Sequence, residues 1–167
     1  MQQAIDSFRD EHTLVLKKLD ALEGIYLHPN KNPETTTELK VLVAFFQTDF
    51  WVHFTKEEEA IFPEIEKFMP RDSGPLGVML AEHEDLRSIN SKLQDALQSF
   101  FSGSDDAGSV ELMKEYGSRF TGILRAHIDK ENGILFVMAE RHLSPTQKEN
   151  TSRLFVEIDA RQRLVAR

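Results

Sequence analysis

Residues 53–67, HFTKEEEAIFPEIEK, and residues 127–141, HIDKENGILFVMAER, look like two copies of one helix. Aligned on their first residue, they share a histidine, a lysine three residues later, a glutamate at four, a phenylalanine at nine and a glutamate at thirteen. Side chains four residues apart lie on one face of an α-helix, so the histidine and the first glutamate of each copy can reach one cation. The repeat therefore predicts a metal site that uses His53, Glu57, His127 and Glu131, with two carboxylates able to bridge two ions.

The rest of the chain has the same helical period. Apolar residues recur at helical spacing in residues 5–22, from residue 39 to about 69, and in residues 76–97 and 112–138. Ser144, Pro145 and Gln147 provide the N-terminal signals of a fifth helix, over about residues 145–161. Because no segment shows the alternation of a strand, we predict an all-α fold. The expected architecture is an antiparallel up-and-down four-helix bundle, about residues 3–142, with an additional C-terminal helix packing across it, in a single domain over residues 1–167.

Local signals predict where these helices begin and end. Gly24, Pro29 and Pro33 indicate a loop that ends where Thr35 and Glu38 form a capping box. Pro63 predicts a kink, or a helix end about one turn earlier. The run SGSDDAGS, residues 102–109, is expected to be the most mobile loop. The inward face of the fourth helix is predicted to carry Leu112, Tyr116, Phe120, Ile123, His127, Glu131, Ile134 and Met138.

Two further histidines fall on the inward faces of the first and third helices. His12 follows Glu11, and His83 follows Glu82, so each half of the chain reads as a histidine followed by an HxxxE motif. A single buried histidine is most often satisfied by one hydrogen bond. Burying four imidazoles and two carboxylates without a cation would cost many kcal/mol, which metal coordination offsets. We therefore predict a dinuclear centre, whereas His28 and His142 lie in or beside loops and receive no role.

Composition limits the kind of metal and partner. The 167 residues contain no cysteine, so nitrogen and oxygen must hold any metal, which favours Fe, Mn or Zn. The net charge of -8 argues against a nucleic-acid partner, since binding phosphate requires a basic face. No apolar run approaches the ~20 residues that cross a bilayer, and the N-terminus is charged, which together indicate a cytoplasmic protein with no membrane partner. The sequence does not indicate a protein partner.

Over residues 5–140 the chain resembles the hemerythrin-like, or HHE cation-binding, family, whose pattern is His, HxxxE, His and a final HxxxE or HxxxxD. The resemblance also includes KEEEAIFPEI, residues 56–65, and EHEDLR, residues 82–87. It implies two non-haem irons with a bridging oxo or hydroxo group. By this resemblance, His12 and His53 ligate one iron, His83 and His127 ligate the other, and Glu57 and Glu131 bridge them.

The third helix departs from the oxygen-carrying members, which have HxxxH there, because Arg87 stands four residues after His83. A guanidinium does not coordinate metal, so one iron loses an imidazole and gains an open position. Arg87 is our candidate catalytic residue, which would orient a bound peroxide or stabilise a developing anion. The alternative is a structural role, in which Arg87 pairs with Glu58 or Glu84. For Tyr116, on the fourth helix, packing is favoured over a buried hydrogen bond.

The resemblance leaves more than one function open. Members with the HxxxR variant resemble peroxide-handling proteins, so a catalase- or peroxidase-like di-iron oxidoreductase is the first hypothesis. The alternative is a non-enzymatic protein that binds, senses or stores O2, NO or iron. Repair of damaged iron centres ranks lower, because family members associated with repair usually carry an extra cysteine-containing N-terminal segment, which this sequence lacks.

Overall fold

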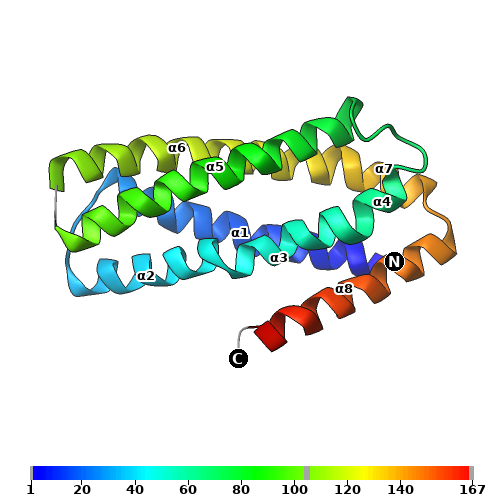
Figure 1. The fold of residues 1–167 in the computed structure, drawn as a ribbon, viewed down its shortest axis with the longest axis horizontal. Helices are drawn as coiled ribbons and strands as arrows, with labels where there is room; N and C mark the ends of the chain where they lie inside the picture. Colours follow the sequence, from blue (N-terminus) through cyan, green and yellow to red (C-terminus); the bar gives the residue numbers. More distant parts are fainter. Residues whose placement is uncertain (1, 104–105, 166–167) are drawn as a thin grey trace.

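The computed structural model describes residues 2–103 and 106–165, and within these ranges every regular element is helical. The helices α1, α2–α4, α5 and α6–α7 lie alongside one another, and α8 crosses one side of them (Figure 1). Two π-helical turns interrupt two of these helical segments: η1 lies between α3 and α4, and η2 lies between α6 and α7. The bounds are α1 Gln2–Leu27, α2 Pro33–Gln47, α3 Asp49–Lys56, η1 Glu57–Ile61, α4 Phe62–Ile65, α5 Gly74–Ser102, α6 Asp106–Lys130, η2 Glu131–Leu135, α7 Phe136–His142 and α8 Pro145–Val165.

Both π-helical turns begin at a glutamate of the repeated motif, Glu57 in η1 and Glu131 in η2. Pro63 lies two residues beyond the end of η1, so the irregularity predicted about one turn before this proline is present. Proline removes a backbone donor and so interrupts the regular α-helical hydrogen bonding at this point. The second turn, η2, has no proline and begins Glu131-Asn132-Gly133. Helical bulges of this kind are frequent at functional sites, and here each one begins at a buried glutamate.

The π-helical turn η2 also changes which residues face inward. Ile134, predicted on the inward face, is 46% exposed, whereas Leu135 is 1% exposed. A π-helical turn contains an extra residue, so the apolar face shifts by one position after Glu131. The prediction for Leu112 was also wrong: it is 43% exposed, and its neighbour Met113 is buried. Tyr116 is partly buried against the core, consistent with packing.

The first helix is longer than predicted. Residues 24–27, expected in the loop, continue α1, because Ile25 and Tyr26 extend its buried face. Tyr26 packs so closely on Gly117 of α6 that a Cβ there would lie 2.6 Å from the tyrosine ring. The predicted start of the second helix was also wrong. Its N-cap is Asn32 rather than Thr35, and the Asn32 side chain accepts a hydrogen bond of 2.8 Å from the backbone N–H of Thr35.

The predicted helix from residue 39 to about 69 is not continuous. It breaks at Thr48, between α2 and α3, and α4 ends at Ile65. Of the predicted mobile loop, residues 104–105 lie outside the described residues. The helix α5 extends into its first residue, Ser102, and is capped by Gly103 in the left-handed conformation. The C-terminal helix begins as predicted, since Ser144 and Gln147 exchange the two hydrogen bonds of a capping box.

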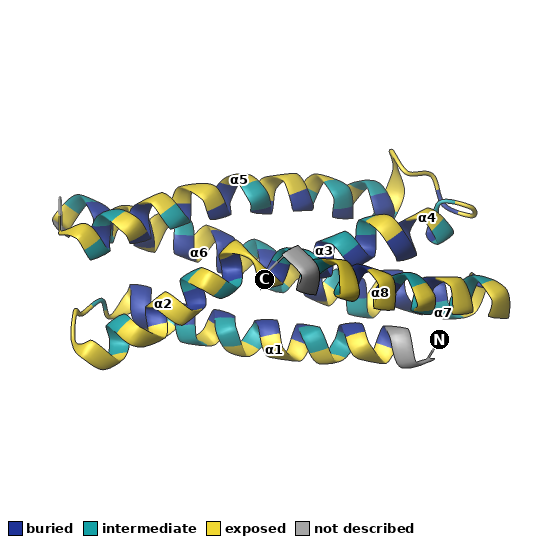
Figure 2. Ribbon diagram, turned by 60° about the horizontal axis from the view of Figure 1, so that its bottom comes forward, coloured by how far each residue is buried: buried dark blue, intermediate teal, exposed yellow. Residues whose placement is uncertain are grey.

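The apolar core has two parts, one on each side of a buried polar layer, and buried residues line the inward faces of the helices (Figure 2). The larger part lies between α1, α2, α3, α5 and α6. The smaller part includes Phe8 of α1, Phe62 of α4 and Phe136 of α7, together with Phe155 and Ile158 of α8. The C-terminal helix therefore closes one end of the core rather than lying free in solvent.

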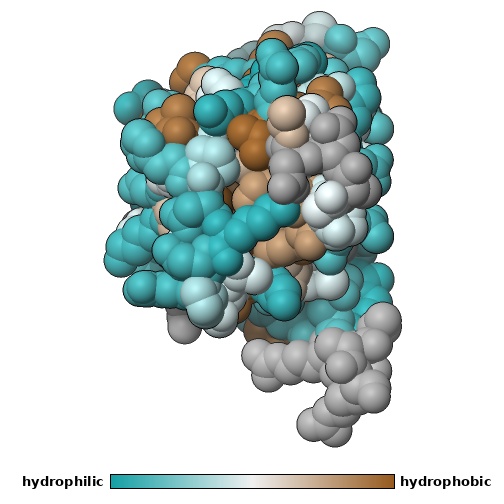
Figure 3. All heavy atoms as spheres, turned by 90° about the vertical axis from the view of Figure 1, so that its left-hand side faces the viewer, coloured by the Kyte–Doolittle hydropathy of each residue, from teal (hydrophilic) through white to brown (hydrophobic). Residues whose placement is uncertain are grey.

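Figure 3 shows the end of the molecule at which α2 begins. Hydrophilic side chains cover most of this face, and apolar side chains are exposed there in small patches. Among the described residues, no helix combines the length and the apolar character that crossing a bilayer requires.

Candidate metal centre

The six residues predicted as metal ligands meet in the polar layer. His12 comes from α1, His53 from α3, His83 from α5 and His127 from α6, while Glu57 and Glu131 open η1 and η2. Each of the six is at most 5% exposed. They form two groups that could each hold a metal ion, and within each group the candidate ligand atoms lie within 4.8 Å of one another. The first group is His12, His53, Glu57 and Glu131, and the second is Glu57, His83, His127 and Glu131.

The four imidazoles point their Nε2 atoms inward, in two pairs. The Nε2 atoms of His12 and His53 lie 3.0 Å apart, and those of His83 and His127 lie 3.2 Å apart. Each Nδ1 atom instead faces an oxygen outside the centre, which makes Nδ1 the protonated nitrogen of a neutral ring. A proton between two facing Nε2 atoms relieves the repulsion of their lone pairs, and a bound metal ion can take its place. This orientation of the rings is the one that metal coordination requires.

The two carboxylates lie between the histidine pairs. One oxygen of Glu57 lies 2.9 Å from Nε2 of His53, and its other oxygen lies 3.2 Å from Nε2 of His83. Glu131 likewise places its oxygens 3.2 Å from His12 and 3.4 Å from His127. All four oxygens are buried, and none accepts a hydrogen bond of good geometry from a described residue. Buried carboxylates without such partners fit a pair of bridged cations.

An outer layer of charged residues holds two of the rings in the same way. Glu11 accepts a hydrogen bond of 2.7 Å from Nδ1 of His53, and its other oxygen lies 2.7 Å from the ammonium of Lys56. In the other half, Glu82 accepts from Nδ1 of His127 at 2.9 Å and pairs with Lys130. Such partners orient metal-ligating histidines and raise their basicity.

Sequence reasoning did not assign these four residues a role. Lys56 and Lys130 were visible as the shared lysine of the repeat, and Glu11 and Glu82 as the residues that precede His12 and His83. Each glutamate serves the histidine of a neighbouring helix rather than the histidine beside it, which depends on how the helices pack.

The remaining two rings break this approximate symmetry. Nδ1 of His83 lies 2.6 Å from Glu58, whereas Nδ1 of His12 faces the side-chain amide of Asn132 at 3.1 Å. Glu58 and Asn132 occupy equivalent positions, one residue after Glu57 and Glu131 respectively. A carboxylate therefore supports one ring where a neutral amide supports the other, so the two candidate metal positions differ electronically.

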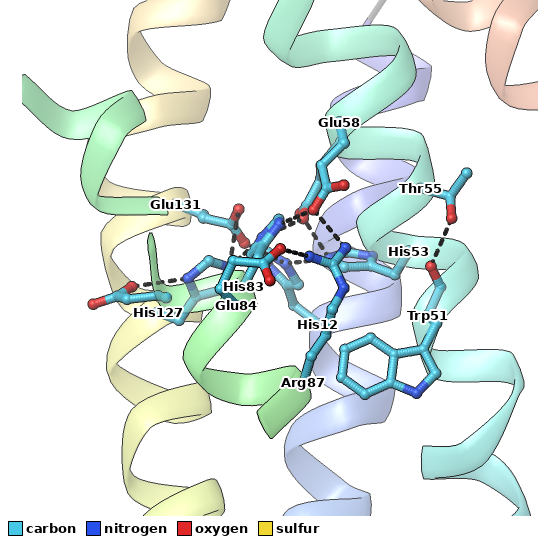
Figure 4. Close-up of polar contacts among 12 residues, drawn as sticks. His12, Trp51, His53, Thr55, Glu58, His83, Glu84, Arg87, His127 and Glu131 are labelled. Carbon is cyan, nitrogen blue, oxygen red and sulfur yellow. Dashed lines mark hydrogen bonds and ion pairs between the residues drawn. The ribbon is translucent and has the colours of Figure 1, made fainter. Parts of the chain in front are cut away.

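The guanidinium of Arg87 points toward the carboxylate of Glu58 (Figure 4). The guanidinium donates a hydrogen bond of 2.7 Å to Glu58 and another of 2.7 Å to Glu84, so Glu58 contacts both Arg87 and His83. The ion pairs proposed as its structural alternative are therefore present. The guanidinium also lies 6.0 Å from the rings of Trp51 and Phe54.

Charge in the centre favours the binding of positive species. Burial opposes charging of the His53 imidazole, but Glu57 and Glu11 outweigh burial and raise its pKa from 6.5 to about 10. His127 behaves in the same way beside Glu131 and Glu82, and its pKa also rises to about 10. Burial raises the pKa of Glu57, yet His53 and His83 hold that pKa well below its ordinary value of 4.5. Protons and metal ions would therefore compete for this centre.

Phenylalanine rings wall the centre. The Phe54 ring stacks on His83 with centroids 3.7 Å apart and planes 9° apart. The phenylalanine shared by the two motif copies has equivalent contacts in both halves, since Phe62 stacks on His83 and Phe136 stacks on His12. These apolar walls keep bulk water away from bound species.

A cavity of about 500 Å³ reaches the centre from one side. It lies between α1, α3 and α8, and of the six candidate ligands its lining includes His53. Its other lining residues are Glu11, Leu14, Val15, Lys18, Phe45, Asp49, Phe50, Val52, Lys56, Asp159 and Gln162. The remaining candidate ligands are at most 1% exposed, so the cavity brings solvent closest to His53.

The two histidines left without a role lie apart from this centre. His28 and His142 are exposed and belong to neither candidate group, and the His142 ring lies 5.0 Å from that of Phe68.

A helical protein with this buried centre of four histidines and two glutamates is a cation-binding protein of the hemerythrin type. The family model described as the hemerythrin HHE cation binding domain matches residues 3–139, and the chain belongs to this family. An iron-sulfur cluster repair protein, DnrN, from Neisseria gonorrhoeae is 29% identical over 100 residues, which are 59% of this chain and 64% of that relative. The match thus spans less than two thirds of the relative's length. No solved structure matches the chain significantly.

Proposed function

We propose that the centre holds two non-haem iron ions and handles hydrogen peroxide. His12 and His53 would bind one ion, His83 and His127 the other, and Glu57 and Glu131 would bridge them. The observation that carries this proposal is the placement of two carboxylates with one oxygen toward each histidine pair. Imidazole and carboxylate also suit manganese and zinc, so metal analysis is the first step of the test.

The ligand set supports turnover rather than simple oxygen carriage. Each candidate metal position has two imidazoles and two shared carboxylates, and Arg87 occupies the sequence position at which the oxygen-carrying members have a third imidazole. Iron with few protein ligands keeps positions for exogenous small ligands, and bound iron would supply the redox chemistry. In disproportionation, one peroxide is oxidised to O2 while a second is reduced to two waters. The phenylalanine walls exclude water, and Arg87 offsets the negative charge of Glu58 beside His83.

We also propose that the helices run as an antiparallel four-helix bundle with α8 as an addition, and that residues 1–167 form a single domain. Small ligands would reach the centre through the cavity beside His53.

A second candidate is repair of iron–sulfur clusters, favoured by the similarity to the repair protein DnrN. In this role the centre would bind iron and release it to a damaged cluster. A further alternative is a non-enzymatic protein that binds or senses O2, NO or iron. It would use the same six residues and would differ from the peroxide-handling enzyme because it would not turn over peroxide.

The test begins with the metal content and optical spectrum of purified protein before and after the addition of peroxide. About two irons per chain, with rapid O2 evolution that His53→Ala abolishes, would support peroxide handling. His28→Ala provides the matched control, because this histidine is exposed and outside the centre. A stable O2 adduct without turnover would contradict the peroxide-handling enzyme and favour a protein that binds or senses O2. Iron transfer to a cluster-depleted acceptor protein, without O2 evolution, would favour repair.

A further inference from the structure

A chain of polar contacts leads from the candidate metal ligand His53 to the C-terminal helix. The Nδ1 atom of His53 lies 2.7 Å from one oxygen of Glu11, and the other oxygen lies 2.7 Å from the ammonium of Lys56. The same ammonium lies 2.9 Å from Asp159 of α8. Three contacts therefore separate α8 from a ring that faces the metal centre.

The burial of Lys56 makes Asp159 important to this chain. The Lys56 side chain is 7% exposed, and a buried ammonium is stable only when acceptors surround it. Without Asp159, Lys56 would have to move toward solvent or rely on Glu11 alone. Either change alters the position of Glu11, and Glu11 fixes the orientation of the His53 ring.

Apolar contacts join the same elements. The ring of Phe155 in α8 packs edge-on against Phe8 of α1, with centroids 4.6 Å apart. Phe8 in turn packs edge-on against His53 at 5.0 Å. The C-terminal helix thus contacts the surroundings of His53 through one polar route and one apolar route.

The other half of the molecule provides an internal comparison. Glu82 joins His127 to Lys130 as Glu11 joins His53 to Lys56, but the Lys130 side chain is 34% exposed. Among the described residues, Lys130 pairs with Glu82 alone, so no counterpart of Asp159 acts there. The C-terminal helix therefore distinguishes the His53 half of the centre from the His127 half.

We propose that Asp159 is a positioning residue of the metal centre, which acts on His53 through Lys56 and Glu11. Docking of α8 then sets how tightly the position formed by His12 and His53 holds its ion. This inference rests on metal binding by the centre and is independent of the peroxide activity proposed above.

The test compares two α8 ion pairs in the iron-loaded protein of residues 1–167. Asp159→Asn removes the carboxylate that contacts Lys56, and Asp159→Glu restores a carboxylate there. The control is Glu59→Gln, which breaks the neighbouring pair between Glu59 and Arg161, 2.6 Å long and exposed at both ends. The rate of Fe²⁺ loss to ferrozine measures retention, and thermal unfolding measures stability in each variant.

We expect Asp159→Asn to release one of the two irons about tenfold faster, the lower end of the effects known for outer partners of metal ligands. Asp159→Glu should return the rate toward that of the unmodified protein, and Glu59→Gln should leave the rate unchanged. Equal rates of iron loss in all four proteins would overturn the proposal. So would equal acceleration by Asp159→Asn and Glu59→Gln, because general loosening of α8 would then explain it.

A second readout separates positioning from loss of stability. In the protein loaded with Co²⁺, the Nδ1 protons of metal-bound histidines give shifted, exchangeable NMR signals. Asp159→Asn should move, or speed the exchange of, the His53 signal while the His127 signal stays in place. Unchanged signals for both histidines would contradict the proposal even if Asp159→Asn lowers the unfolding temperature.

Discussion

The guanidinium of Arg87 lies 2.7 Å from Oε1 of Glu58, the same oxygen that lies 2.6 Å from Nδ1 of His83. One carboxylate oxygen thus connects a cation at the edge of the bundle to a ring at its centre. The equivalent position in the other half, four residues after His12, is Leu16, and no such connection exists there among the described residues. Glu58 therefore joins Arg87, the residue at which this chain departs from HxxxH, to the candidate metal ligand His83.

Arg87→Met should lower peroxide turnover about tenfold without loss of iron, because Glu58 and His83 lose a neighbouring cation. Glu58→Gln should produce a similar loss, and the double variant should be little worse than either single one, since both act through His83. Steady-state O2 evolution measures the effect. Glu84→Gln is the control, because Glu84 contacts Arg87 but is largely exposed and should change the rate much less. Additive losses in the double variant would contradict this route.

Metal content should respond differently to loss of a shared and an unshared ligand. Glu57→Ala removes a carboxylate that belongs to both candidate groups, so it should lower the metal content by more than one ion per chain. His12→Ala affects one group and should leave about one ion bound. Elemental analysis of proteins purified under identical conditions provides the comparison, with His142→Ala as a control. Equal metal contents for Glu57→Ala and His12→Ala would argue against a bridging role for Glu57.

Stability of the metal-free protein should depend on pH through its histidines. The pKa of His53 and of His127 is raised from 6.5 to about 10, so their contribution is fully present below pH 6.5 and is lost as the pH rises through about 10. Glu57 has a lowered pKa, so its contribution is present above pH 4.5 and is lost in stronger acid. The unfolding temperature should therefore fall by roughly 5 °C or more between pH 7 and 10.

Calorimetric scans of metal-free and metal-loaded protein at both pH values check this expectation. Bound metal replaces the proton at Nε2, so the loaded protein should show a smaller fall between pH 7 and 10. His53→Gln should also reduce the fall in the metal-free protein. An unfolding temperature that stays constant from pH 7 to 10 in the metal-free protein would refute the raised pKa values.

Filling the cavity beside His53 should slow access of small ligands. Val52 lines the cavity and is partly buried. Val52→Trp should therefore lower the rate at which azide binds to the iron-loaded protein. It should lower the rate of azide release by the same factor. The binding constant should stay unchanged, because the metal ligands are untouched. Stopped-flow absorbance gives both rates. Ala126→Trp is the matched control, because Ala126 is exposed and precedes His127 as Val52 precedes His53. Similar slowing in both variants would rule out the cavity beside His53 as the specific route of azide.

The shift of the apolar face at η2 can be tested by truncation. Leu135→Ala should lower the free energy of unfolding by about 2–5 kcal/mol, because the leucine is fully buried. Ile134→Ala should change it by no more than about 0.5 kcal/mol, because nearly half of the isoleucine is exposed. Chemical denaturation of the two variants distinguishes them. A larger loss for Ile134→Ala would indicate a regular α-helix through this segment.

The sequence predicted the helices and the six residues of the centre because both leave regular patterns. Apolar residues at a helical period revealed the inward faces, and the repeated HxxxE motif placed His53 and Glu57 on one of them. The register failed at Ile134, because the periodicity was extended as a regular α-helix through a segment that forms a π-helical turn. The end predicted for the first helix fails for a similar reason: Gly24 indicates a break, but the contact of Tyr26 with Gly117 of α6 accompanies a helix that continues to Leu27.

By itself, the sequence determined that four histidines and two glutamates belong to one buried centre, since residue type and helical spacing are local properties. Only the tertiary structure decided which groups support that centre. Glu11 reaches His53, Glu82 reaches His127 and Asp159 reaches Lys56, and each pair joins different helices. Their contact depends on how far each helix is rotated and displaced against its neighbour. That arrangement follows from packing of the whole core, and no local pattern in the chain records it.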